Sequence, residues 1–232
     1  MITNKSKITL ACPTTGMGDI LVLTSVAKHI PNSIVQLQTN ISHFSRFFQG
    51  ICSQIIITDN ILPTPEIGQG HHAVRKLRYF GLESKCHMPL VLFSEEELNK
   101  GISMIKNYEN PIAFVGNSSV MWKHEREPSH QYLQNLIDKL CEQGHTVLQF
   151  GISKNFTQFK RTIPIVDLDI NNLICYYAAI KKYVGVDTGD THLMLALGGS
   201  CEIYIPNFGA RIPELWNYNS TKAKYYYFNK ND

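Results

Sequence analysis

The chain has 232 residues, of which 44% are hydrophobic and 18% charged, and its formal net charge is +3. This composition supports a packed core and excludes a largely disordered protein, while so small a positive charge does not argue for a nucleic-acid partner. The sequence has no run of 18 apolar residues, and residues 1–10 lack the apolar segment of a signal peptide. We therefore expect a cytoplasmic protein that does not span a membrane.

The first half of the chain alternates short β-rich segments with helical ones. The expected strands are 8–12, 34–38 and 54–58, and the expected helices are 19–29, 43–48, 72–80 and 94–108. A Pro- and Gly-containing loop covers 59–70, and Ser94 begins a capping-box pattern with Glu97. Strands that alternate with helices predict a parallel sheet.

The same alternation restarts after Pro111, which marks the expected domain boundary. The expected strands are 112–115, 146–150, 163–167, 183–186 and 201–205, and the helices between them include 129–143 and 171–181. The sequence therefore predicts an α/β protein with two Rossmann-like domains, 1–108 and 109–232, whose parallel sheets face a cleft.

The most informative segment is 183–199, which predicts a strand, a turn and a helix. The strand stops at Asp187, the turn contains Thr188 and Gly189, and His192 begins the apolar part of the helix. Free amide groups at a helix N-terminus suit an anion such as a diphosphate, and a glycine lets a ligand approach the backbone. His192 is either a phosphate or ribose contact or simply a polar residue in the first turn.

A second glycine-containing turn follows the first expected strand and contains Gly16, Met17, Gly18 and Asp19. It begins like a dinucleotide fingerprint, but Leu21 stands where the third glycine is required, which disfavours NAD and FAD. The glycines still indicate close approach of a ligand. Asp19 is either the N-cap of the following helix or a general base at the edge of a cleft.

A third candidate is the loop after the first strand of the second half. Ser118 and Ser119 offer hydroxyl groups there, and Lys123 offers a mobile positive charge for phosphate. A surface loop with a solvated lysine is the alternative interpretation.

The sequence gives no support for a metal site. Asp167 and Asp169 imitate a D-x-D pair, but a turn and a helix cap explain them better. The six cysteines form no C-x-x-C motif, and the histidines lack metal-ligand spacing. We therefore expect no metal and no bound cofactor.

Together these segments resemble the ADP-heptose:lipopolysaccharide heptosyltransferases of glycosyltransferase family 9, which have the GT-B fold. Residues 185–193 are similar to the family signature V-D-T-G-x-x-H, and residues 16–21 to its N-terminal G-x-G-D motif. Lys123 falls where the family has a phosphate-binding lysine. The first half is shorter than in family members, which implies a reduced N-terminal domain.

The resemblance implies a metal-independent, inverting transfer of a sugar, with heptose as one candidate, from a nucleotide diphosphate sugar to an acceptor hydroxyl. It implies that the N-terminal half binds a glycan or other acceptor and that Asp19 is the catalytic base. Lys123 and the 188–192 helix start would hold the diphosphate, and Asp187 would contact the donor sugar or its phosphate. Fixed donors aimed at a leaving group stabilise its developing charge.

Two other functions remain open: a nucleotide-sugar-binding protein that transfers nothing, and a sugar-nucleotide epimerase, which shares the fold. A role in lipopolysaccharide biosynthesis would bring the protein to the inner membrane face, where the basic group Arg75, Lys76 and Arg78 offers peripheral contact as an alternative to plain solvation. No sequence pattern specifies an oligomeric state.

Overall fold

The computed structural model describes residues 8–11, 16–69, 71–82, 85, 87–117, 127–207, 218 and 220–229. The chain forms two units of internal packing. The first comprises Met1–Leu92 with Ile212–Asn219, and the second comprises Phe93–Arg211 with Ser220–Asp232. Each is an α/β unit built on a parallel sheet, as the alternation of strands and helices predicts.

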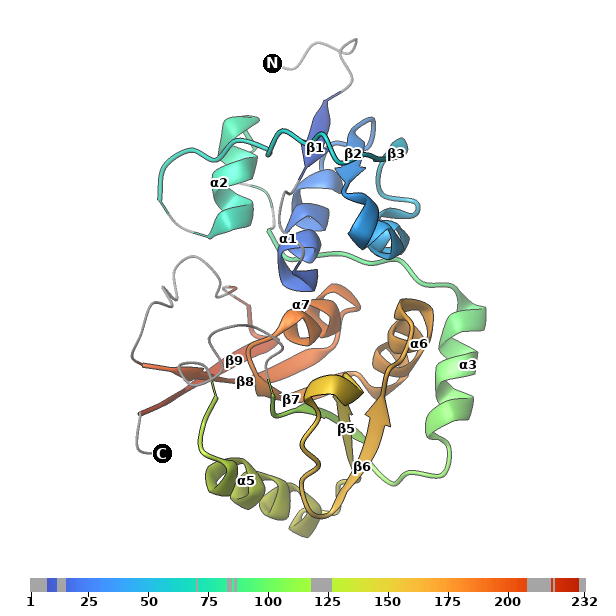
Figure 1. Ribbon diagram of the computed structural model, residues 1–232, viewed down its shortest axis with the longest axis vertical. Coiled ribbons are helices and arrows are strands. Elements are labelled where there is room, and N and C mark those ends of the chain that lie inside the picture. The colour runs from blue at the N-terminus through green and yellow to red at the C-terminus, as the bar shows by residue number, and fades with distance from the viewer. Residues whose placement is uncertain are drawn as a thin grey trace. The chain divides into compact units, whose positions relative to one another are not determined.

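The first unit contains a three-stranded parallel sheet of order β1-β2-β3, and Figure 1 shows it in blue. Its elements are β1 (Thr9–Ala11), α1 (Met17–Ala27), β2 (Ile34–Leu37), η1 (Thr39–Phe48), β3 (Gln54–Ile57) and α2 (His72–Tyr79). The small sheet agrees with the expectation of a reduced N-terminal domain. Thr64 pairs with the free edge of β1, because its amide donates to Ala11 O at 3.0 Å and its hydroxyl accepts from Ala11 N at 2.7 Å.

Helix α1 is the centre of this unit. All of its residues from Ile20 to Ala27 are buried, which explains a sequence that is apolar around the whole helix. The two polar side chains of this stretch are also enclosed. Thr24 donates to Leu21 O at 2.7 Å and accepts from the amide of Leu90 at 3.0 Å, so its hydroxyl ties the segment before α3 to α1.

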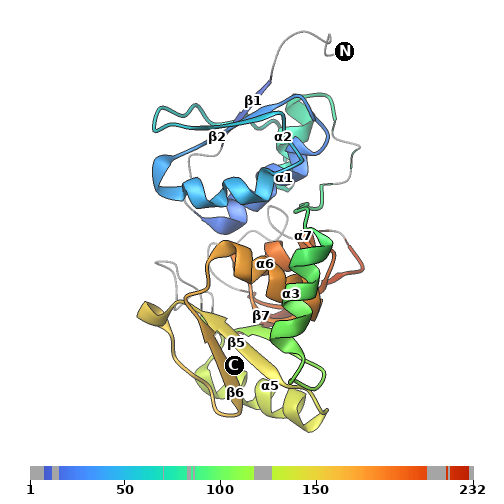
Figure 2. The same cartoon turned by 90° about the vertical axis from the view of Figure 1, so that its right-hand side faces the viewer.

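The second unit contains a six-stranded parallel sheet of order β6-β5-β4-β7-β8-β9. Its strands are β4 (Ile112–Val115), β5 (Val147–Gly151), β6 (Thr162–Val166), β7 (Lys182–Val186), β8 (Ser200–Pro206) and β9 (Ala223–Phe228). Its helical elements are α3 (Glu95–Ile105), α5 (His130–Glu142), η2 (Ser153–Asn155), α6 (Ile170–Ile180) and α7 (Gly189–Ala196). Figures 1 and 2 show α5 on one face of the sheet and α3, α6 and α7 on the other.

The core beneath α5 is built from alternate residues of the strands, because successive side chains point to opposite faces. It includes Phe114, Val147, Val184 and Phe228, which pack against Ile137 of α5. The run 225–228, interpreted from the sequence as a strand or a packed tail, forms part of β9 at the edge of this sheet.

Helix α3 packs with the second unit, so the observed division between Leu92 and Phe93 differs from the boundary expected at 108–109. The reason is a close helix contact at Gly101. A Cβ at this position would lie 1.9 Å from Cys175 O of α6, so the missing side chain allows the two helices to approach. Ser94 caps α3 through the expected box with Glu97, with distances of 3.1 and 2.7 Å.

None of the helices in the described ranges is both long and apolar enough to cross a membrane.

Candidate functional site

The order of the second sheet places two of the predicted segments side by side. The chain proceeds from β4 outward to β5 and β6, and from β7 in the other direction to β8 and β9, so the order reverses between β4 and β7. These two strands are paired in parallel, with Val115 opposite Gly185. Open α/β sheets bind ligands outside the carboxyl ends of the strands at this kind of reversal. The turns that begin at Gly116 and Asp187 therefore meet at the expected position of a ligand.

Gly185 allows this close pairing. Its φ is +154°, and a Cβ would lie 2.2 Å from Val115 O. A residue with a side chain would have to displace the backbone of β4, because this overlap is with a backbone oxygen. The glycine that precedes Val186 and Asp187 in the signature is thus required by packing. The missing side chain lets β7 pair closely with β4, and this pairing holds the start of the turn after β7 beside the end of β4.

Helix α7 begins directly after this turn and is capped by its own residues. The Thr188 hydroxyl accepts from the amide of Asp190 at 3.3 Å, and the Thr188 amide donates to the Thr191 hydroxyl at 3.4 Å. The amide of Thr191 contacts Thr188 O at 3.2 Å. Of the first-turn amides, only that of Gly189 has no acceptor within the described residues. The turn therefore offers a ligand fewer donors than an uncapped helix would.

Asp190 occupies the second position of α7 and is the most constrained carboxylate of the site. It accepts from Tyr177 OH of α6 at 2.8 Å and from the Thr188 hydroxyl at 3.1 Å. Burial raises the pKa of Asp190, and these two hydrogen bonds only partly offset that effect. Nearby, Tyr183 OH donates to Val186 O at 2.6 Å and so fixes the last peptide group of β7.

The two other predicted residues of this turn differ in exposure. Asp187 is partly exposed. Its charge raises the pKa of the Cys201 thiol on β8, although burial of that thiol is the larger cause. His192 is only 4% exposed. Asp187 is thus accessible at the turn, whereas the side chain of His192 on α7 is almost fully buried.

The turn before α1 is the candidate site of the first unit. Helix α1 starts at Met17 with Gly16 as its N-cap, so Asp19 is the third helical residue. The interpretation of Asp19 as the N-cap is therefore wrong. No side chain caps α1, and a Cβ on Gly16 would lie 3.0 Å from Asp19 Oδ2. The carboxylate of Asp19 therefore folds back toward Gly16 at the helix start.

The loop after β4 is described only at its beginning. Ser118, Ser119 and Lys123 lie outside the described residues, so their predicted roles stay predictions. Gly116 has a packing role of its own, since a Cβ there would lie 2.7 Å from the ring of Phe159.

The carboxylates of the D-x-D pair, Asp167 and Asp169, stabilise a turn and a helix cap, as the sequence predicts. Asp169 caps α6 by accepting from the amide of Asn172 at 2.9 Å, a hydrogen bond that holds the pKa of Asp169 below its ordinary value. Asp167 Oδ1 accepts from Ser153 N at 2.9 Å, and hydrogen bonding from Ser153 likewise lowers the pKa of Asp167. The described part of the chain contains no group of three or more His, Cys, Asp or Glu that would hold a metal ion.

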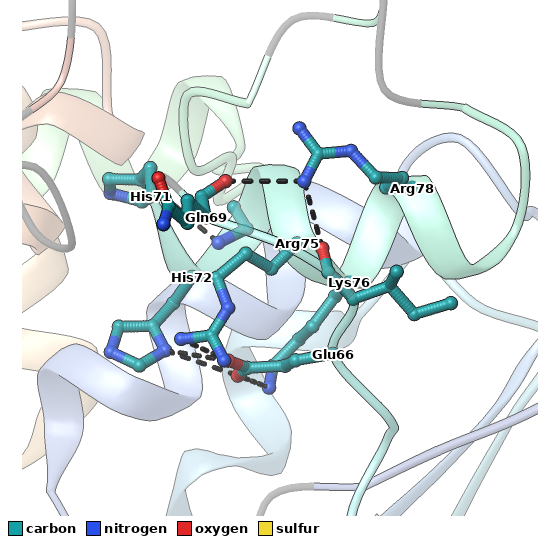
Figure 3. A network of polar contacts seen from close by, with 9 residues as sticks. Glu66, Gln69, His71, His72, Arg75, Lys76 and Arg78 are labelled. Atoms are coloured by element: carbon teal, nitrogen blue, oxygen red, sulfur yellow. Dashed lines mark hydrogen bonds and ion pairs between the residues drawn. The ribbon is translucent and has the colours of Figure 1, made fainter.

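The basic group on α2 is engaged within the first unit. Figure 3 shows His72, Arg75 and Lys76 converging on Glu66, with distances of 3.0 Å from His72 and from Arg75 and a short contact from Lys76. Burial would raise the pKa of Glu66, but hydrogen bonding and charge from Lys76 and His72 outweigh it and hold that pKa low. Arg78 donates to Ile67 O and Gln69 O at 2.8 and 3.2 Å. These side chains fasten the loop before α2 to the helix.

Reasoning from the sequence missed the pair formed by Tyr177 and Asp190. A tyrosine inside an apolar helix and an acid in a helix first turn were the available signals, but neither shows that the two side chains meet. The contact depends on α6 and α7 packing on the same face of the sheet.

No protein-family model matches this chain, and no curated protein matches it significantly. Solved structures do match over nearly its whole length. A glycosyl transferase family 9 protein from Veillonella parvula DSM 2008 superposes with a TM-score of 0.76 at 10% identity, covering 98% of this chain and 87% of that one. The chain has the fold of family 9 glycosyltransferases. This GT-B likeness confirms the expected α/β class, with one three-stranded and one six-stranded parallel sheet.

Two heptosyltransferases of E. coli also match. ADP-heptose lps heptosyltransferase II gives a TM-score of 0.71 at 13% identity, covering 95% of this chain and 90% of that chain. Heptosyltransferase WaaC with ADP gives 0.58 at 11% identity, covering 98% and 92%. At these identities the likeness establishes the fold, and activity has to be argued from the site.

Proposed function

We propose that the chain is a glycosyltransferase that moves a sugar from a nucleotide diphosphate sugar to an acceptor hydroxyl. The observation that carries this proposal is the position of the D-T-G turn. It follows β7 at the reversal of the strand order, beside the turn that leads toward Lys123, in a chain with the family 9 fold. A diphosphate bound there would meet the amide of Gly189 and the side chain of Lys123.

The second unit would bind the donor, and the first unit would supply the base. We assign that role to Asp19, whose carboxylate lies over the uncapped start of α1, with Gly16, Met17 and Gly18 forming the adjacent substrate-binding backbone. Deprotonation of the acceptor hydroxyl by Asp19 lets its oxygen attack the anomeric carbon as the nucleotide diphosphate leaves, which inverts that centre. The same proposal gives Asp187 a contact with the donor sugar.

The reaction as proposed requires no metal, because Lys123 and backbone amides carry the leaving-group charge. A chelator should therefore leave the rate unchanged. A rate that depended on added metal would contradict this part of the proposal and return attention to Asp167 and Asp169.

A donor screen tests the proposal first. A ligand that binds the native state raises its stability, by about 2.7 kcal/mol when present at 100 times its Kd. We expect one of the ADP-, GDP-, UDP- and CDP-sugars to raise the melting temperature, and ADP-heptose is the first to test because one matching structure is a heptosyltransferase with ADP. Lys123→Ala should weaken that binding. A melting temperature that no sugar nucleotide changed would reject the donor site.

Turnover assays separate the proposed transferase from its rivals. Release of nucleotide diphosphate that requires an acceptor hydroxyl supports transfer. An epimerase would convert the donor with no acceptor present, and a binding protein would be stabilised by the donor without turning it over.

We place the reaction in the cytoplasm, with peripheral contact at the inner membrane face if the acceptor is lipid-linked. Because Arg75 and Lys76 are engaged by Glu66, that contact would come from the acceptor rather than from α2. A lipopolysaccharide precursor is one such acceptor, and its use in place of other glycans is tested by comparing acceptors in the same assay.

A further inference from the structure

A carboxylate lies where the proposed function requires an anion to bind. Asp190 follows Gly189 in the first turn of α7, at a position that the V-D-T-G-x-x-H pattern leaves open. Its contacts within the described residues are to hydroxyl groups and to its own amide, at 2.8 Å from Tyr177 OH and 3.1 Å from the Thr188 hydroxyl. These donors are uncharged, so within the described residues no cation is in contact with Asp190 to compensate its negative charge.

Burial makes the ionised form of Asp190 costly, while the hydrogen bonds from Tyr177 and Thr188 favour that form. Tyr177 of α6 and Tyr183 of β7 are buried and face it, and burial followed by the charge of Asp190 raises the pKa of both phenols well above the ordinary value. Cys201 of β8 is a neighbour of both tyrosines, and Asp187 is a second carboxylate in the same turn. His192 follows two positions along α7, with its side chain buried. A diphosphate at Gly189 would add further negative charge to this cluster.

The Thr188 hydroxyl also takes part in this network. It donates to Asp190 Oδ2 at 3.1 Å, which is shorter than its 3.5 Å contact with Tyr183 OH, and its oxygen accepts from the Asp190 amide. In this arrangement Thr188 can accept a hydrogen bond but cannot donate one to a phosphate oxygen. An ionised Asp190 thus opposes an anion by its charge and also withholds the hydroxyl donor nearest to it.

We propose that Asp190 takes up a proton from solvent when a diphosphate binds at the start of α7, and that this proton releases the Thr188 hydroxyl to donate to the ligand. The new O–H bond forms on Oδ2 and donates to Thr188 Oγ, whose own hydrogen then turns to a phosphate oxygen. Tyr177 continues to donate to Oδ1. Asp190 is thus a positioning residue that makes donor binding stronger as the pH falls.

This inference rests on the proposed function, because it needs a diphosphate at this turn. The direction of the Asp190 pKa supports it: burial has already raised that pKa in the free protein, and a bound anion raises it further. Binding that shifts a pKa upward must take up protons over the pH range between the free and bound values.

The experiment is calorimetric titration of the full chain with ADP between pH 5.5 and pH 8, in two buffers of different ionisation enthalpy. Wild-type protein should take up protons on binding, and its affinity relative to Asp190→Asn should rise as the pH falls, by up to roughly tenfold per unit for one proton. Ionisation of ADP itself is common to both proteins and cancels in the ratio. Asp167→Asn, which removes an exposed carboxylate of the same unit, should behave like wild type.

The outcomes separate the two proposals. ADP that bound neither protein at any pH would reject the donor site and this inference with it. Binding with the same pH dependence in wild type and Asp190→Asn would reject the inference alone. If Asp190→Asn does not fold, Tyr177→Phe replaces it: losing a donor to the carboxylate should move the proton uptake to higher pH, and an unchanged profile would overturn the inference.

Discussion

The starts of α1 and α7 differ although the same pattern of strand, glycine-containing turn and helix produces both. Helix α1 has a glycine as its N-cap and no side-chain cap, whereas α7 is capped by Thr188 and Thr191. Each has an acidic residue in its first turn. Asp19 lies over the exposed helix start, and Asp190 is tied inward to Tyr177.

This comparison shows that a strand–turn–helix pattern is not enough to make an anion site. The amide groups at a helix start attract an anion only when they have no other acceptor and no carboxylate already neutralises them. Helix α1 is the open end only in that it lacks a side-chain cap, because the Asp19 carboxylate lies over its start. Under the proposed function, α7 would offer the amide of Gly189, and Lys123 and protonation of Asp190 would add to it.

The largest effect is expected at the open end. Asp19→Asn should lower the rate of transfer by roughly 10²–10⁴-fold, the usual contribution of a general base, while donor affinity stays near the wild-type value. Rates with saturating donor and acceptor, together with the Kd for ADP, provide the test. Full activity would remove Asp19 as the base and leave α1 with a structural role only.

The next effect concerns how α7 is positioned. Gly185→Ala should lower the free energy of unfolding by about 3 kcal/mol, because the new Cβ would overlap the backbone of β4 and the positive φ suits glycine. Urea denaturation measures this change. Gly144→Ala is a useful control: its φ of +83° is also unfavourable for alanine, but a Cβ there meets nothing within 4 Å. Equal losses in the two variants would show that the contact with β4 does not constrain the turn.

Removing the cap of α7 tests whether capping and ligand binding are linked. Thr188→Ala should cost about 1 kcal/mol of stability, as the loss of an N-cap usually does, and should also weaken ADP binding. Ser129→Ala is the matched control, since Ser129 caps α5 by accepting from the Tyr132 amide at 3.1 Å. We expect a similar loss of stability there with ADP affinity unchanged. An effect of both variants on affinity would point to a general loosening of the unit.

The pH dependence of stability tests the carboxylate of Asp190, which is partly exposed, without any ligand. Because the pKa of Asp190 is raised in the folded state, the folded protein binds more protons than the unfolded chain between the ordinary and the raised value. The free energy of unfolding should therefore fall as the pH rises through that range and then level off. Asp190→Asn should lack this component, so its stability relative to wild type should increase with pH. A difference that stayed constant with pH would show that Asp190 ionises freely.

The smallest change would make α1 resemble α7. Gly16→Ser introduces a capping hydroxyl, which should stabilise the first unit by a few tenths of a kcal/mol at most, because glycine is already a fair N-cap and the new Cβ must displace the Asp19 carboxylate. Transfer should nevertheless slow, since the new side chain must displace the Asp19 carboxylate that the proposal makes the base. A variant that was as active as wild type would show that the open end of α1 is not needed.

The basic helix α2 shows how folding changes the surroundings of a charged segment. Arg75, Lys76 and Arg78 read as a possible docking surface because Glu66 is separated from them by a loop with two glycines. In the folded unit the loop returns to the helix, and Lys76 is only 8% exposed. Arg75 and Lys76 thus share one carboxylate within the first unit, and Arg78 donates to backbone carbonyls.

The features that the sequence by itself determined are those made by residues a few positions apart. Asp169 caps the helix that follows it, Ser94 and Glu97 form their box, and Thr188 begins α7, because each hydrogen bond closes within about one helical turn. Short β-rich segments likewise determined the strands, and their alternation with helices determined the parallel class of both sheets.

Only the tertiary structure decided which of these local elements meet. Tyr177 reaches Asp190 because α6 and α7 share one face of the sheet, α3 joins the second unit through the space left by Gly101, and Gly185 adopts a φ that the sequence does not specify. Such contacts depend on the packing of whole helices and strands, whose relative positions follow from burial over the entire unit rather than from any local pattern.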